Sequence, residues 1–155
     1  MSYEITTDDS LSPSTKPQIL SFLSAFYQTS DSESAHAKYV SNFTSDATLI
    51  MGAKKATGSD VNLLERGNED YANKIEILTL RHGLWTHVAS RRHIPTKVFF
   101  GSDNEVMLYG TVRYILRADT ENEVEVPWAG RVVFSLEDGV KMKFYQVYLV
   151  YSPPH

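Results

Sequence analysis

Two polar residues in the apolar last third of this 155-residue chain are of types that could do chemistry together. His93 lies in the segment RRHIPT, and its imidazole titrates near neutral pH, so it could both accept and donate a proton. Arg131 lies between Gly130 and Val132, where a lone buried cation would be costly. It therefore needs a core carboxylate, a route to solvent, or an anionic ligand such as an enolate or carboxylate, and we favour a salt bridge to a core carboxylate.

Long strands must position these residues. The segments RRHIPTKVFFG, EVMLYGTVRYILR, VEVPWAGRVVFSLEDG and VKMKFYQVYLVY follow one another across short turns between residues 91 and 151. Such strands need helices to cover one face of the sheet. The pattern predicts an α+β domain with a curved, mostly antiparallel sheet around a pocket.

Helical segments precede the sheet. Capping-box spacing at residues 15–18, with Pro17 in the first turn, predicts the start of the first helix. Apolar spacing then predicts, in order, a helix over residues 33–43, a strand over 46–51, a short strand ending near 58 and a helix over 75–90. We expect residues 1–15 to be a flexible lead-in and 16–155 to form one domain. The 60–74 segment is predicted to be a loop that could include a helical turn, and we favour a surface insertion over a lid at the pocket mouth.

Arg81 falls in the middle of the apolar arc of the third helix. A tether to Asp46 or to a backbone carbonyl would satisfy it, and we favour this over a ligand contact. Asp46 is also the carboxylate that could orient His93. His93 itself has a second interpretation, as a half-exposed residue at a strand end without a special role.

Composition limits the function classes. The chain has 42% hydrophobic and 22% charged residues, a net charge of −4 and no long basic block, which argues for a soluble domain without a nucleic-acid surface. No apolar stretch is long enough for a membrane helix, and the polar N-terminus favours a cytoplasmic location. The absence of cysteine excludes disulfides and thiolate sites. His82, His87 and His93 do not have usual ligand spacing, and cofactor motifs are absent, so we expect neither metal nor cofactor.

Three segments carry a resemblance to a known family: FTSDATLIMG (43–52), RRHIPTKVFFGSDNEV (91–106) and FSLEDGVKMKF (134–144). On these segments the chain resembles the nuclear transport factor 2-like (cystatin-like cone) superfamily, in its SnoaL-like and scytalone-dehydratase-like branch, over roughly residues 19 to 151. The resemblance implies a sheet wrapped around the N-terminal helices to form a cone with an internal pocket. His93 matches the pocket histidine that acts as general acid and base in that branch.

The resemblance also implies which strand positions face the pocket. They are Val112 and Tyr114, then Ala129, Arg131 and Val133, then Tyr145, Val147 and Leu149. Two departures stand out. Ketosteroid isomerases of the superfamily have a catalytic aspartate where this chain has Met51, and scytalone dehydratase has a small polar pair where this chain has Ala129 and Arg131. Neither of those reactions therefore carries over intact.

Two functions are consistent with these patterns. The first is a cofactor-independent isomerase, dehydratase or cyclase of secondary metabolism, acting on a small apolar oxygenated molecule of the polyketide or terpenoid kind. His93 would move a proton and Arg131 would stabilise an oxyanion. Tyr27, Trp85, Tyr114 and Tyr145 would bind the substrate, within an aromatic lining that could also include Tyr39 and Trp128.

The second function is a non-catalytic ligand-binding or dimerisation module of the same fold. Phe144, Gln146 and Tyr148 are predicted on the outer face of the last strand, where they could form a homodimer surface. Convergence of His93 and Arg131 on one cavity would favour the enzyme over the module.

Overall fold

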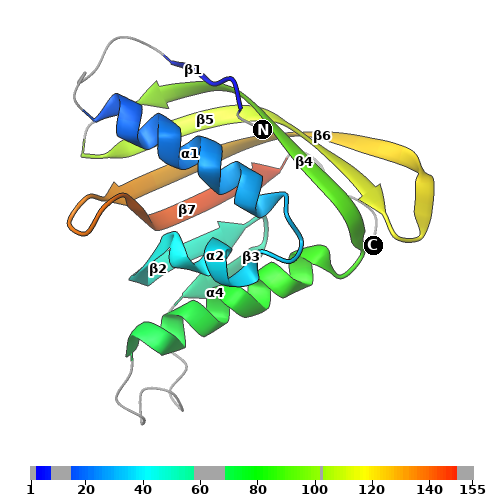
Figure 1. Cartoon of the computed structure of the whole chain (residues 1–155), viewed down its shortest axis with the longest axis horizontal. Coiled ribbons are helices and arrows are strands. Elements are labelled where there is room, and N and C mark those ends of the chain that lie inside the picture. The colour runs from blue at the N-terminus through cyan, green and yellow to red at the C-terminus, as the bar shows by residue number, and fades with distance from the viewer. Residues whose placement is uncertain (1–2, 8–14, 58–68, 102, 150–155) are drawn as a thin grey trace.

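A curved seven-stranded sheet, in the order β1-β4-β5-β6-β7-β2-β3, forms the frame of the protein in the computed structural model (Figure 1). The structure describes residues 3–7, 15–57, 69–101 and 103–149, with the backbone alone for 69–75. The strands are β1 (Thr6–Thr7), β2 (Phe43–Met51), β3 (Lys54–Thr57), β4 (Val88–Phe100), β5 (Glu105–Leu116), β6 (Asp119–Ser135) and β7 (Lys141–Leu149). The pairs β1–β4 and β2–β7 are parallel and the others are antiparallel. The predicted curved, mostly antiparallel α+β fold is confirmed.

The helices of the described residues lie on one side of this sheet. Helix α1 (Lys16–Ser30) crosses the inner face, while α2 (His36–Ser41) and α4 (Glu69–Trp85) lie beside the β2–β3 hairpin (Figure 1). Ile19, Leu23 and Phe26 of α1 are at most 2% exposed, and burying each such side chain stabilises the fold by roughly 1.5–3 kcal/mol. Among the described residues, none of the helices is long and apolar enough to cross a membrane.

β4 and β5 approach each other closely beside an irregularity in their pairing. The register between them shifts between Pro95 and Lys97, next to the pair Pro95–Gly110. A Cβ atom at Gly110 would lie 2.2 Å from the carbonyl oxygen of Ile94. Only glycine fits there, and the bulge increases the local twist that wraps the sheet around its contents.

Several element boundaries differ from the sequence prediction. The third helix ends at Trp85 rather than Ser90, because Val88 and Ser90 pair with Leu116 and Ile115 of β5. This pairing overrides the helical periodicity of the segment. The helix begins at Glu69, so residues 69–74 of the predicted loop are helical, and residues 58–68 lie outside the described residues.

The N-terminal segment also differs. Within the predicted lead-in, Thr6 and Thr7 pair with Lys97 and Val98 to make β1, while residues 8–14 lie outside the described residues. Thr15 occupies the N-cap of α1 but makes no side-chain capping hydrogen bond, so that part of the capping-box prediction is wrong.

Candidate functional site

A pocket of about 480 Å³ opens between the inner face of the sheet, the end of α4 and the β2–β3 hairpin, a volume typical of small-molecule sites. Apolar and aromatic side chains make up most of its wall. They are Tyr39, Met51, Ala53, Leu84, Val88, Val112, Tyr114, Leu116, Trp128, Tyr145, Val147 and Leu149. The polar side chains in the wall are Ser30, Lys54, Thr86, His87, Arg91 and His93.

His93 is held in the pocket wall by Asp31, the residue that ends α1. Asp31 Oδ1 lies 2.6 Å from His93 Nδ1, and the carboxylate also accepts the backbone N–H of His93 at 3.0 and 3.2 Å. The hydroxyl of Tyr3 donates a further hydrogen bond to Asp31 Oδ2. These bonds fix the ring and place its proton on Nδ1, so that Nε2 remains as the proton acceptor.

The surroundings of His93 favour the uncharged imidazole. Burial lowers the pKa of His93 below its ordinary value of 6.5; Asp31 opposes this shift, and the cations Arg91 and Arg81 add to it. The rings of Tyr27 and Trp128 lie 5.0 and 5.6 Å from the imidazole. An uncharged, oriented imidazole in a mostly apolar cavity has the properties of a general base.

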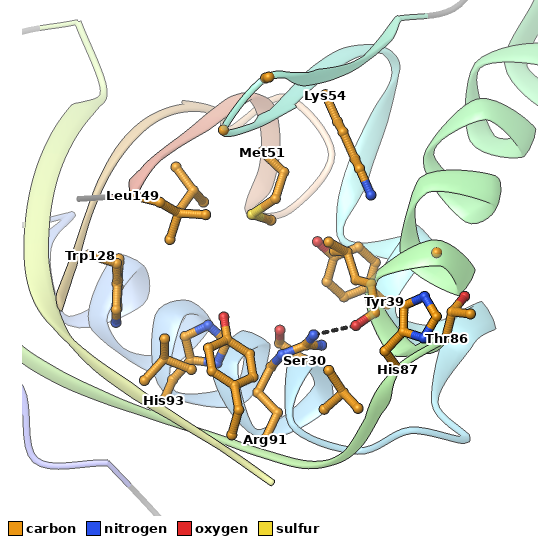
Figure 2. A pocket seen from close by; sticks show the side chains of 18 of the residues that line it. Ser30, Tyr39, Met51, Lys54, Thr86, His87, Arg91, His93, Trp128 and Leu149 are labelled. Atoms are coloured by element: carbon orange, nitrogen blue, oxygen red, sulfur yellow. Dashed lines mark hydrogen bonds between the residues drawn. The ribbon is translucent and has the colours of Figure 1, made fainter. Parts of the chain in front are cut away.

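Arg91 stands next to His93 in the same wall. The two residues are two apart on β4, so both side chains point inward while Arg92 between them is exposed. Figure 2 shows Arg91 and His93 side by side, reaching into the cavity. The sequence prediction gave Arg91 no role in the pocket. Residues two apart on a strand face the same side, so the position of His93 already indicated that Arg91 would face the pocket as well.

The predicted substrate-binding aromatics divide into two groups. Tyr114 and Tyr145 line the pocket, whereas Tyr27 and Trp85 lie behind its wall. The hydroxyl of Tyr27 lies 3.0 Å from that of Tyr145, so Tyr27 orients a lining residue instead of touching the cavity. Trp85 is 4% exposed and stacks against the guanidinium groups of Arg91 at 4.6 Å and Arg81 at 5.4 Å.

The prediction that Arg131 faces the pocket is wrong. Trp128 lines the pocket, and Gly130 and Val132 are buried with it on the inner face of β6. Arg131 therefore lies on the outer face, where its side chain is 40% exposed and its Nε bonds Glu105 Oε2 at 2.7 Å. The alternative interpretation, an ion pair with a carboxylate of the protein, describes Arg131, although the carboxylate is at the surface.

Ala129 and Val133 share the outer face with Arg131, so their predicted pocket positions are wrong as well. His93 and Arg131 do not converge on one cavity. The criterion that was to favour an enzyme over a binding module is therefore not met. The structure instead brings Arg91 and His93 together in the pocket wall, with Asp31 bonded to His93.

Arg81 is tethered to backbone carbonyls, as predicted. It is fully buried, and its guanidinium donates to the carbonyl oxygens of Ser30 at 2.7 Å, Ser32 at 2.6 Å and Thr29 at 3.3 Å. Burial lowers the pKa of Arg81 to about 10, which leaves it charged at neutral pH. Asp46, the other partner considered, lies on β2 and accepts a hydrogen bond from Thr44.

Comparisons with known proteins were made for both sequence and structure. No protein-family model matches the sequence, and no curated protein does. An NTF2-like protein of unknown function from Burkholderia pseudomallei superposes with a TM-score of 0.61 and 12% identity, covering 87% of this chain and 89% of that one. The chain has the nuclear transport factor 2-like fold.

Two further structures with this fold have names that bear on chemistry. A protein from Jannaschia sp. CCS1 assigned to the SnoaL-like polyketide cyclases has a TM-score of 0.65 and 12% identity, covering 92% of each chain. The hexachlorocyclohexane dehydrochlorinase LinA-type3 of Novosphingobium barchaimii has a TM-score of 0.64 and 14% identity, covering 91% of this chain and 90% of that one. At these identities the comparisons show the fold alone.

Within the nuclear transport factor 2-like fold, the cone contains the pocket that the sequence pattern predicted. Met51, at the end of β2, lines the pocket as an apolar residue. In the described part of the chain, His, Asp and Glu side chains do not gather in groups of three that could hold a metal ion.

Proposed function

We propose that this protein is a cofactor-independent isomerase, dehydratase or cyclase that acts by acid–base chemistry on a small, largely apolar oxygenated molecule of the polyketide or terpenoid kind. The observation that carries this proposal is the Asp31–His93 pair in the wall of an apolar pocket. His93 Nε2 would remove a proton from a carbon of the substrate and return it elsewhere. A polyketide cyclase and a dehydrochlorinase with the same fold are consistent with such chemistry.

Aromatic side chains would fix the substrate beside the base. Tyr114 and Tyr145 contribute hydroxyls to the wall, and burial keeps their pKa values raised, so both remain hydrogen-bond donors at neutral pH. Trp128 adds a flat apolar surface next to His93. Holding a carbon acid and a base in contact in this way removes much of the entropic barrier to proton transfer.

A pH–rate profile tests this proposal without knowledge of the natural substrate. Nitrobenzisoxazole is a neutral ring compound that opens to a coloured phenolate when a base removes its C–H proton and the N–O bond breaks. The protein alone should open it with saturation kinetics and faster than free imidazole. Because burial lowers the pKa of His93, kcat/KM should reach a plateau at higher pH, and the midpoint of its fall on acidification should lie below pH 6.5.

Asp31→Asn is the matched variant for this profile. Removing the anion takes away an interaction that raises the pKa of His93, so the fall in rate should move to lower pH. The plateau rate should drop as well, because the amide no longer fixes the tautomer. A midpoint above pH 6.5, or one that moves upward in Asp31→Asn, contradicts His93 as the base.

The other candidate function is a non-catalytic ligand-binding module, which the outward position of Arg131 favours. It predicts saturable binding of apolar rings without any acceleration of ring opening over free imidazole. A cytoplasmic location stays a prediction from the sequence.

We also propose that the outer face of the sheet forms a homodimer. Four large apolar side chains are exposed there, Phe99 (38%), Met107 (38%), Tyr109 (44%) and Tyr148 (42%). Tyr109 and Tyr148 both pair with Ala129 across the sheet, and Phe99 stacks on Tyr109, so the patch is continuous. Contiguous apolar patches of this kind mark interaction surfaces.

The mass in solution tests the dimer. Wild type should have twice the chain mass of 17.5 kDa in analytical ultracentrifugation. Tyr148→Glu places a charge at the β7 side of the apolar patch, across Ala129 from Tyr109, and should give the monomer mass. Arg113→Glu, an equally exposed site near the far end of β5, serves as the control and should stay dimeric. An unchanged mass in Tyr148→Glu would remove this surface from consideration.

A further inference from the structure

Arg91 is a buried cation to which the described part of the protein gives no carboxylate. It is 8% exposed, and its guanidinium lies over the rings of Trp85 at 4.6 Å and Tyr114 at 5.3 Å. It donates one hydrogen bond to the carbonyl oxygen of Leu84 and interacts with the Tyr114 hydroxyl. A guanidinium has five N–H donors, so these two partners leave donors unused on a side chain that lines the cavity.

Three other arginines of this chain are more exposed and have carboxylate partners. Arg113, Arg117 and Arg131 are 40–47% exposed, and each pairs with a glutamate at 2.7–3.7 Å. These three exposed arginines thus have carboxylates, while the buried Arg91 has none within 4 Å among the described residues. Asp31, whose charge does reach Arg91, is bonded to His93 and Tyr3 instead.

The described part of the pocket wall likewise has positive groups without carboxylates. Among the described residues of its wall, Arg91 and Lys54 are the formally charged ones, joined by His87 and His93, and no Asp or Glu is among them. Figure 2 shows Lys54 on the opposite side of the cavity from Arg91. The chain carries a net charge of −4, so this positive interior is a local feature, and a cavity with low-dielectric walls strengthens its attraction for anions.

We propose that Arg91 binds an anionic oxygen of the ligand, and that the pocket takes apolar ring molecules carrying one carboxylate or ionised enol. Arginine matches such groups with two parallel hydrogen bonds, and the stacked rings of Trp85 and Tyr114 hold its fork in place. Because residues two apart on a strand face lie about 7 Å from each other, an anion on Arg91 sets the adjoining ring beside His93. This last step rests on the function proposed above, whereas the binding does not.

Equilibrium binding of an unreactive pair of probes tests the proposal. Naphthoate and naphthamide have the same ring and nearly the same shape but differ in charge, and calorimetry at about pH 8 keeps His93 uncharged. Wild type should bind naphthoate at least about tenfold more tightly, the expected gain for charge-assisted hydrogen bonds. Equal affinities in wild type would overturn the proposal, even if Arg91 variants did not fold.

Variants assign the preference to one residue. Arg91→Met should bind both probes alike, while Arg131→Met, the same change on the outer face, should keep the wild-type preference. Lys54→Met should have a smaller effect, because Lys54 is exposed at the mouth. A preference that persists in Arg91→Met, or that is lost in Lys54→Met alone, overturns the assignment. His93→Gln should still bind naphthoate more tightly than naphthamide. Anion binding by Arg91 can therefore be tested even if His93 is not a catalytic base.

Discussion

Replacing His93 with Gln should lower kcat/KM for nitrobenzisoxazole opening at least about a hundredfold, since a positioned general base contributes roughly 10²–10⁴-fold. Glutamine can still bond Asp31 but has no basic nitrogen. The fold should survive, because the side chain is similar in size and the backbone N–H of residue 93 still bonds the carboxylate. Initial rates at low and at saturating nitrobenzisoxazole concentrations measure the loss of kcat/KM. A thermal melt of the same variant measures whether the fold survives.

His87→Gln is the matched control for this variant. His87 also lines the pocket, but it is exposed and lies at the mouth. Its replacement should leave kcat/KM within about threefold, less than 1 kcal/mol in the barrier. Two results would count against His93 as the base. One is an unchanged rate in His93→Gln, and the other is a loss of rate that follows a matching loss of melting temperature, which would make His93 a structural residue.

The strands of this protein could be predicted because their signal is local. Alternation along residues 105–116 and 141–149, with short turns between, indicates both strands and their partners. The inward positions of Val112, Tyr114, Tyr145, Val147 and Leu149 follow from the same alternation. The end of the third helix was wrong because strand pairing with β5, a contact distant in sequence, decided the conformation of residues 88–90.

The outward position of Arg131 could have been predicted from the residue pattern of β6. Glu123, Glu125 and Arg131 have the same parity on β6, while Val126, Trp128 and Val132 have the other. A strand with charges on one parity and apolar residues on the other exposes the charged parity. The resemblance to the family implied that Arg131 faces the pocket, whereas the alternation of charged and apolar residues on β6 indicates the outer face.

Asp31 could not have been found in the same way. It lies in the polar segment SDSES, with the composition of an ordinary helix end, and it contacts His93 across 62 residues of sequence. Only the packing of α1 against β4 brings the pair together. A candidate base could be predicted from residue type, but the carboxylate that orients it required the tertiary structure.

Arg81 should be the most important residue for stability among the charged side chains at this site. Arg81→Met keeps the apolar stem but removes hydrogen bonds to the carbonyls of Thr29, Ser30 and Ser32. Thr29 and Ser30 are at most 8% exposed, so their carbonyl oxygens would lose partners away from water. We expect the free energy of unfolding to fall by about 3 kcal/mol, measured by urea denaturation.

Arg131→Met makes the same chemical change at a side chain that is 40% exposed, and it should cost less than about 1 kcal/mol. Equal losses in the two variants would contradict a structural role for the buried tether.

The three carbonyls bound by Arg81 come from the residues on either side of Asp31. Arg81 thus fixes the end of α1 from which Asp31 reaches His93. Well below the urea midpoint, Arg81→Met should therefore lower kcat for ring opening more than it raises KM, which a loss of stability alone would not do.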